Sequence, residues 1–242
     1  MNCLPIELIH LIFDELDFLN KINFKKVCKF FNTFLITDFY NLPVELLFRL
    51  DDNILADKWY ITKLCAWDNP HIKNISHMVN LKHLDCSLRS GIDDYYIKNL
   101  NLIELKAASN QKIRNIGHMS NLKVLDCSSY FCGISDEDIK NLNLTELYAY
   151  DNLKITKIGH MSNLKVLDCG LNCGINDNEI KKLNLIELHA KNNLRIKNIK
   201  HMSNLKILNC GGNYSFISDN DILNLNLTKL YSFGNPKVTI KK

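Results

Sequence analysis

The chain returns four times to one stretch, His118-Met119-Ser120-Asn121-Leu122-Lys123-Val124-Leu125-Asp126-Cys127. The other copies begin at His77, His160 and His201, so the histidines are 41, 42 and 41 residues apart. A fixed period of this length is typical of a solenoid, in which each unit buries its apolar face only by stacking on the next. We therefore expect a repeat array whose function lies on its surface.

The period divides into two alternating units of about 21 residues. One type reads Leu102-x-x-Leu105-x-Ala107-x-x-Asn110, and the other reads Leu122-x-x-Leu125-x-Cys127. Copies of the first type begin at Ile61, Leu144, Leu185 and Leu227, and copies of the second at Leu81, Leu164 and Leu205. Nine units fill residues 59–242.

This pattern resembles the leucine-rich repeat, Leu-x-x-Leu-x-Leu-x-x-Asn, in which a short strand leads into a turn held by Asn. The resemblance implies an α/β solenoid with a parallel inner sheet of about nine short strands. We expect the Asn of each first-type unit, and Asn172 and Asn213 of the second type, to satisfy backbone groups of the turns. The third Leu is replaced by Ala, Cys or Ser, so the methionines of the repeat are expected to fill the core.

Helix starts recur in the second-type units. Ser135-Asp136-Glu137-Asp138 and Ser218-Asp219-Asn220-Asp221 place a capping oxygen before acids in a first turn. Asp93 and Asn176 hold the same place in the other two copies. We expect short helices on the outer face of these units and extended or 3₁₀ segments in the others.

Residues 1–36 have a different pattern, with two helices predicted. Pro5 suits a first helical turn, and Leu8, Ile12 and Leu16 share one face. A second helix is predicted from about Lys21 to Leu35, with aromatic residues on one side. So few residues cannot bury all these rings among themselves. The surplus apolar face either binds a partner or caps the array, with Phe30, Phe31 and Phe34 packed on its end.

The same residues resemble the F-box. Leu4-Pro5-x-Glu7-Leu8, Ile12-Phe13-x-x-Leu16-Asp17 and Val27-Cys28-Lys29-x-Phe31 occur in its order and spacing, with Phe31 where the family often has Trp. The resemblance implies that this segment docks the Skp-type adaptor of a cullin-RING ubiquitin ligase and performs no chemistry. The matching positions, and hence the adaptor-binding candidates, are Leu4, Pro5, Leu8, Ile12, Leu16, Val27, Cys28 and Phe31.

These patterns predict three parts. Residues 1–36 form an F-box-like helical domain and residues 59–242 form the solenoid. Between them, residues 37–58 carry a second Leu-Pro-x-Glu-Leu string and are predicted to be a helical linker that caps the first repeat.

Composition indicates an ordinary soluble chain, with 46% hydrophobic and 23% charged residues. No run of 18 or so apolar residues could cross a bilayer, and acids occupy the first 19 residues, so we expect an intracellular protein without membrane contact. The net charge of +4 is too weak an argument for a nucleic-acid partner. The repeated cysteines, about 10 Å apart at two strand spacings, are expected to be buried and reduced.

Neither catalysis nor metal binding is predicted. The repeated histidines are also about 10 Å apart at two strand spacings, whereas ligands of one ion lie about 2 Å from it. A repeated hydrogen bond to the neighbouring turn is the expected role of each histidine. The glycines lack a phosphate-binding pattern, no nucleophile and base stand together, and no cofactor is expected.

The concave face of the sheet is the remaining candidate site. Outward positions lie between the inward Leu and the small residue, and just beyond the small residue. Aromatic rings beside Asp and Lys suit a protein partner, although the same pattern also fits a solvated sheet face. The target-binding candidates are Trp67, Asp85, Lys106, Asp126, Tyr148, Tyr150, Asp168, His189, Lys191, Tyr231 and Phe233.

We therefore predict a substrate receptor of an SCF-type ubiquitin ligase, which is not itself an enzyme. Its partners would be the Skp-type adaptor, through it a cullin, and a target protein on the repeats. The alternative is a stand-alone interaction scaffold or decoy without a ligase. A third hypothesis, nucleic-acid binding by the basic array, is opposed by Asp at three of four second-type positions of the concave face.

Overall fold

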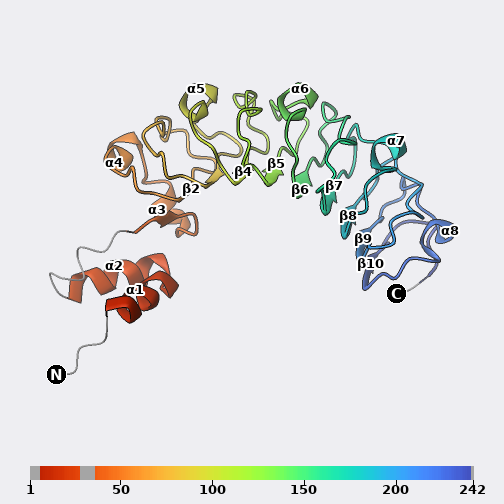
Figure 1. The fold of residues 1–242 in the computed structure, drawn as a ribbon, viewed down its shortest axis with the longest axis horizontal. Helices are drawn as coiled ribbons and strands as arrows, with labels where there is room; N and C mark the ends of the chain where they lie inside the picture. Colours follow the sequence, from red (N-terminus) through yellow and green to blue (C-terminus); the bar gives the residue numbers. More distant parts are fainter. Residues whose placement is uncertain (1–5, 28–35, 241–242) are drawn as a thin grey trace.

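The repeats stack into an arch, with strands along its inner side and short helices along its outer side (Figure 1). This computed structural model describes residues 6–27 and 36–240. Two helices, α1 and α2, lie at one end of the arch beside α3, and the C-terminus lies at the other end.

The N-terminal helices pack through phenylalanines. Helix α1 spans Ile6–Glu15 and helix α2 spans Phe18–Val27. Phe13 is buried, with its ring centre 5.7 Å from that of Phe24. The break between the helices is shorter than the sequence predicts, because Asp17 accepts a hydrogen bond from the Asn20 amide at 2.9 Å and so caps α2.

The segment that joins these helices to the repeats contains a strand as well as helices. The sequence predicts a helical linker at residues 37–58, and the structure places α3 (Val44–Leu47) and α4 (Asp52–Leu55) there. Before them, β1 (Asp38–Phe39) pairs in parallel with the first repeat strand. Phe39 is buried and meets the Phe18 ring edge-on at 5.5 Å. A two-residue strand has too few positions to show alternation in sequence.

All strands of the described residues belong to one parallel sheet, ordered β1 to β10 along the chain. Nine of them fall in the repeats, and β1 is the tenth. Each repeat strand has three residues, and the middle one is the inward leucine. The repeat strands are β2 (Lys63–Cys65), β3 (His83–Asp85), β4 (Glu104–Lys106), β5 (Val124–Asp126), β6 (Glu146–Tyr148), β7 (Val166–Asp168), β8 (Glu187–His189), β9 (Ile207–Asn209) and β10 (Lys229–Tyr231).

Every repeat leaves the sheet through one residue with a positive φ. This residue lies two positions after the small inward residue, and only glycine adopts the conformation without a steric cost. The residues are Asp68, Leu88, Ser109, Ser129, Asp151, Leu171, Asn192, Gly212 and Gly234. Because the left-handed residue recurs at the same position, the chain leaves the sheet in the same direction in all nine repeats.

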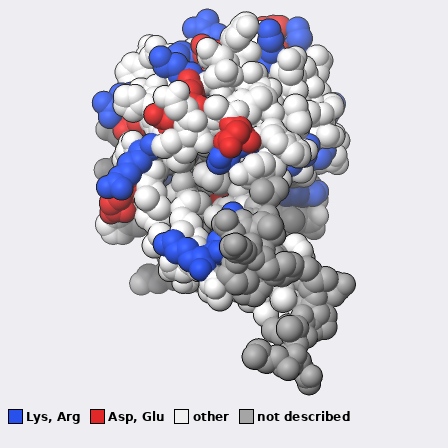
Figure 2. Space-filling view, turned by 90° about the vertical axis from the view of Figure 1, so that its left-hand side faces the viewer, with Lys and Arg blue, Asp and Glu red and all other residues white. Residues whose placement is uncertain are grey.

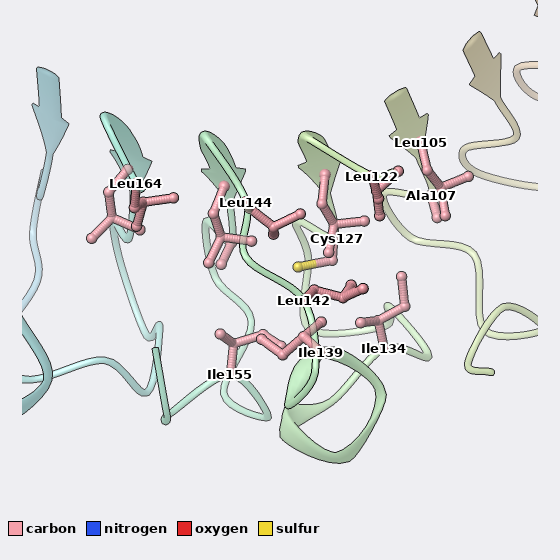
Figure 3. Packing of buried hydrophobic residues seen from close by; sticks show 14 of the residues in the cluster. Leu105, Ala107, Leu122, Cys127, Ile134, Ile139, Leu142, Leu144, Ile155 and Leu164 are labelled. Atoms are coloured by element: carbon pink, nitrogen blue, oxygen red, sulfur yellow. The ribbon is translucent and has the colours of Figure 1, made fainter. Parts of the chain in front are cut away.

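The core is a continuous stack of leucine, isoleucine and small side chains between the strands and the outer segments (Figure 3). Met78, Met119, Met161 and Met202 are fully buried, as the small third position requires. Cys86, Cys127, Cys169 and Cys210 are buried free thiols. Burial raises the pKa of each of these thiols, which keeps them protonated and unreactive.

Buried asparagines tie each first-type unit to the unit, or the linker, that precedes it. In Asn152, Nδ2 donates to the carbonyls of Cys127 at 2.7 Å and Ile134 at 3.3 Å, while Oδ1 accepts from the Lys154 amide at 3.0 Å. The same arrangement recurs at Asn69, Asn110 and Asn235, and Asn193 bonds in the same way to Cys169 and Arg195. Backbone groups that no helix or sheet would pair are thereby satisfied.

The prediction for Asn172 and Asn213 was wrong. Both are exposed, and Asn172 donates to the Asp151 carboxylate instead of a buried carbonyl. In second-type units the chain folds inward one or two residues later and buries a smaller side chain. The buried residues are Ser90, Cys132, Cys173 and Ser215.

The short outer helices occur where the capping residues predict them. They are α5 (Asp94–Ile97), α6 (Asp136–Ile139), α7 (Asp177–Ile180) and α8 (Asp219–Ile222). Ser135 with Asp138 and Ser218 with Asp221 form capping boxes. In addition, the first residue of each helix accepts backbone amides of the following unit. Asp136 Oδ1, for example, accepts the amides of Thr156 at 2.7 Å and Lys157 at 3.0 Å.

Candidate functional site

The first candidate surface is the exposed side of α1. Leu8 and Ile12 are each 45% exposed, Leu16 is partly buried, and Val27 at the end of α2 is 70% exposed. Leu11, which the sequence pattern did not select, is 61% exposed. The remaining adaptor-binding candidates, Leu4, Pro5, Cys28 and Phe31, and the capping candidates Phe30 and Phe34, lie outside the described residues. An apolar helix surface in water is typical of a docking site.

The second candidate surface is the concave face of the sheet. The strand register aligns its predicted central column without a break from β2 to β10. Its residues are Cys65, Asp85, Lys106, Asp126, Tyr148, Asp168, His189, Asn209 and Tyr231. The structure therefore brings the predicted residues of this column together, one per strand.

The column just beyond the strands is less uniform. Trp67, Lys191 and Phe233 are exposed, Phe233 almost completely at 98%, and Tyr150 is partly buried. Ser87, Gly170 and Gly211 in the same column are buried. A Cβ on Gly170 would lie 2.7 Å from the Tyr150 ring, so glycine makes room for that ring. Small, buried residues thus separate the large candidate side chains of this column.

Sequence reasoning missed a third column, at the first position of each strand. Glu104, Val124 and Glu146 from this column line a hollow of about 400 Å³ together with Lys106, Asp126 and Tyr148. The alternation of strand side chains places the residue before the inward leucine on the same face as the residue after it. The same rule could therefore have identified this column in the sequence.

The centre of the concave face is acidic, although the chain as a whole carries +4. Between β4 and β8 the first and central columns hold five carboxylates, those of Glu104, Asp126, Glu146, Asp168 and Glu187. Lys106 is the one Lys or Arg at those positions. A negative potential here favours partners with positive side chains.

Each of these glutamates is held by a residue of its own strand. Lys106 Nζ lies 3.4 Å from Glu104, the Tyr148 hydroxyl donates to Glu146 at 2.9 Å, and His189 pairs with Glu187 at 2.5 Å. The first-column glutamates are thus fixed in position on the strands before a partner arrives.

The aspartates bond to the backbone of their own turns. Asp85, Asp126 and Asp168 each accept the amide two residues ahead, at 2.9 to 3.0 Å. Burial raises the pKa of Asp85 and of Asp168, and these hydrogen bonds only partly offset it. A cation nearby would favour the charged form of both carboxylates.

One end of the concave face is joined to the linker by Tyr40. Its hydroxyl donates to Glu104 at 3.1 Å, His83 Nδ1 lies 3.1 Å from the same carboxylate, and Lys106 lies over the Tyr40 ring. Burial disfavours the charged Glu104, but the hydrogen bond from His83 and the charge of Lys106 outweigh it and lower its pKa. The free part of the concave face therefore begins beyond β4.

The repeated histidines serve the backbone. Nε2 of His77, His118 and His201 lies 2.9 to 3.2 Å from a carbonyl at the end of the preceding unit's helix or helical turn. The sequence predicts this hydrogen bond for all four repeated histidines, and the structure shows it for these three. Among the described residues, no three His, Cys, Asp or Glu side chains gather as a metal site would require.

Surface charge at the N-terminal end of the arch is mixed. Figure 2 faces this end, and acidic and basic side chains are interspersed across its described part. Within residues 6–27 and 36–240, none of the helices has the length and apolar character needed to span a bilayer.

A comparison with protein families identifies the first part of the chain. Residues 1–38 match the F-box domain. This match includes α1, α2 and all eight adaptor-binding candidates. A search of curated proteins found no relative of the chain.

Proposed function

We propose that this protein is the substrate-recognition subunit of a cullin-RING ubiquitin ligase of the SCF type. The N-terminal helices would dock a Skp-type adaptor, and the repeat array, which we assign to the leucine-rich repeat architecture, would hold a target protein. The observation that carries the proposal is the F-box match at residues 1–38. F-box domains bind Skp-type adaptors and, through them, cullins.

The exposed apolar side of α1 supports the adaptor part. Leu8, Leu11 and Ile12 are on average half-exposed in the free chain, while Phe13 on the opposite side is buried. Burying such side chains against a partner favours a complex because it removes apolar surface from water. The ligase chemistry would reside in other subunits.

The concave face supports the target part. Its acidic centre, the hollow beside Tyr148 and the prearranged glutamates fit a target segment with Lys or Arg side chains. Tyrosine offers a large contact area at little entropic cost, which is why it is enriched at interface hot spots. We therefore place the target between β4 and β10.

The adaptor part can be tested with purified proteins. We expect the full chain to bind an immobilised Skp-type adaptor, and Leu8→Asp with Ile12→Asp to abolish binding because two charges replace apolar contacts. Leu223→Asp is the matched control, since Leu223 is 62% exposed at the far end of the arch. Equal binding by the double variant and the control would refute the adaptor part, provided that circular dichroism shows both to be folded.

The target part has a separate test. Affinity capture with mass spectrometry should recover a protein with the wild type and lose it with Tyr148→Ser and Asp126→Lys, while the adaptor and cullin remain. Recovery of that protein without any adaptor or cullin would instead support the stand-alone scaffold.

A further inference from the structure

A second exposed surface lies on the turns that follow the strands, at the carboxyl edge of the sheet. We call it the lateral edge. It presents large apolar side chains to solvent, with Tyr130 and Phe131 each 59% exposed. Its exposed apolar residues are Tyr130, Phe131, Leu153, Leu194, Tyr214 and Phe216. Each of them follows the left-handed residue of its turn by one to four positions, in the turns after β5, β6, β8 and β9.

Basic residues lie along the same edge as these apolar residues. Lys112, Lys154, Arg195 and Lys237 each follow a buried asparagine by two residues, and their backbone amides bond to that asparagine. The buried ladder therefore fixes the spacing of the cations along the edge. Lys237 Nζ also lies 3.8 Å from the centre of the Phe216 ring. Aromatic rings with basic side chains are typical of binding surfaces.

The acids of these turns are already engaged. Asp68 holds the Arg89 guanidinium at 2.8 Å, and Asp151 accepts from Asn172 at 2.8 Å. Asn172 is a neutral donor, so Asp151 keeps its charge, but the basic side chains of this edge outnumber it: Lys112, Arg114, Lys154, Arg195 and Lys237. The lateral edge therefore carries an excess of positive charge, whereas the concave face a few residues away carries negative charge. A partner of the lateral edge must complement cations.

A hollow of about 380 Å³ lies on this edge. Tyr130, Phe131 and Leu153 form its apolar part, and Arg114 and Lys154 are its cations. The Tyr130 and Phe131 rings meet edge-on at 5.5 Å, and Lys154 Nζ is held by the Cys132 carbonyl at 2.6 Å. Among the described residues, the Arg114 side chain has no hydrogen-bond or ion-pair partner.

We infer that the lateral edge binds an acidic protein segment with apolar side chains, one of which enters the hollow beside Arg114. Spacing favours a peptide over a single-stranded nucleic acid. The aromatic residues after β5 and those after β9 are four strands, or roughly 19 Å, apart, and successive bases need neighbouring rings on which to stack. Leucines lie between them instead. This inference is independent of the proposed ligase function.

Fluorescence anisotropy with the full chain tests it. The probe is a labelled peptide of about twelve residues in which Asp and Glu alternate with Leu and Phe. A peptide with Lys in place of the acids and an oligothymidine of equal length are the comparison probes. We expect the acidic peptide to bind more tightly than both, and its affinity to fall as salt is added.

Two variants locate the contact. Arg114→Glu should weaken the acidic peptide by about tenfold or more, and Phe131→Ser by about fivefold, as for interface hot spots. Lys182→Glu and Tyr95→Ser, exposed on the outer side of the arch, are the matched controls and should change the affinity less than twofold. Melting curves check that all four fold.

Three results would overturn the inference. The acidic peptide could fail to bind the wild type, or it could bind Arg114→Glu as tightly as the wild type. Oligothymidine could also bind more tightly than the peptide and lose affinity in the same variants, which would make the edge a nucleic-acid site.

Discussion

Single residues set the shape of each repeat. One residue per unit takes a positive φ, and in most units it is an ordinary residue such as Leu88 or Asp151 that pays about 1 kcal/mol or more for the left-handed conformation. The left-handed residue turns the chain toward the side chain that each turn buries. That side chain is an asparagine in the first-type units and a serine or cysteine in the second-type units.

Replacing Gly234 tests the left-handed position. Its φ is +78° and a new Cβ would come no closer than 3.4 Å to Asn213, so Gly234→Ala should lower the free energy of unfolding by about 1 to 2 kcal/mol through the backbone conformation alone. Gly117→Ala is the matched control, because its new Cβ meets only the Asp138 carbonyl oxygen at 3.5 Å and its φ is not positive. Urea denaturation should show a lower midpoint for the first variant alone. Similar midpoints would contradict the argument.

Removing Asn152 tests the buried ladder. Asn152→Ala leaves two buried carbonyls and one amide without partners, so we expect a loss of about 3 kcal/mol in the free energy of unfolding. Asn172→Ala, which removes an exposed bond to Asp151, should change it by less than about 0.5 kcal/mol. Equal losses in the two variants would show that burial of the amide does not matter.

At this scale the sequence predicted the buried asparagines of the first-type units but not their counterparts in the second type. Ser90 and Cys132 hold the inward position there, and Cys132 lies one residue later than Ser90 relative to the strand. A serine or cysteine at a variable distance from the strand cannot be recognised in the sequence as the buried turn residue. Counting a fixed number of residues from the strand therefore selected exposed residues such as Asn172.

The first residue of each outer helix links that helix to the following unit. The carboxylates of Asp52, Asp94, Asp136, Asp177 and Asp219 each accept two amides of the following unit. In the sequence these acids look only like favourable first-turn residues. Their contact across the units could not be predicted, because it depends on how far the next outer segment lies from the helix.

Acid should weaken the last of these contacts. The Thr239 hydroxyl and the amides of Ile240 and Thr239 lower the pKa of Asp219 below its ordinary 3.8. A lowered folded-state pKa gives stability that is present above the ordinary value and is lost as the pH falls through the folded-state pKa. The melting temperature of the wild type should therefore exceed that of Asp219→Asn at pH 6, and the difference should shrink as the pH falls below the ordinary value of 3.8. A difference that grows in acid would contradict this.

The short strands were predictable because their pattern recurs in nine units, and the outer helices because their capping residues recur in the four second-type units. The start of α2 and the strand β1 were not. Asp17 follows the first helix and caps the second. The apolar periodicity of the sequence instead predicts a break as far as Asn20. β1 is a strand only because the first repeat offers it a partner at Lys63 and Leu64.

At the scale of the whole molecule, the arch separates three surfaces of different chemistry. The exposed side of α1 is apolar, the concave face between β4 and β8 is acidic, and the lateral edge is basic and aromatic. The small net charge conceals this separation, since opposite charges on different surfaces cancel in the total. The concave candidates could be read from the alternation of strand residues, but the lateral edge required the direction of the turns.

The N-terminal helices and the repeat array meet at the linker. Phe18 packs on Phe39, and Tyr40 reaches Glu104 on the concave face, so the adaptor-binding helices and the target face are joined through one short segment. We predict that the helices and the array nevertheless act as separate binding units.

Hydrogen exchange of the full chain, with and without a Skp-type adaptor, can show whether the helices and the array bind separately. Exchange slows where binding buries or stabilises backbone amides. We predict protection confined to residues 1–38, with unchanged exchange in β4 to β10, which leaves the concave face open for a target. Protection spread along the concave face, or no protection at residues 1–38, would contradict the claim.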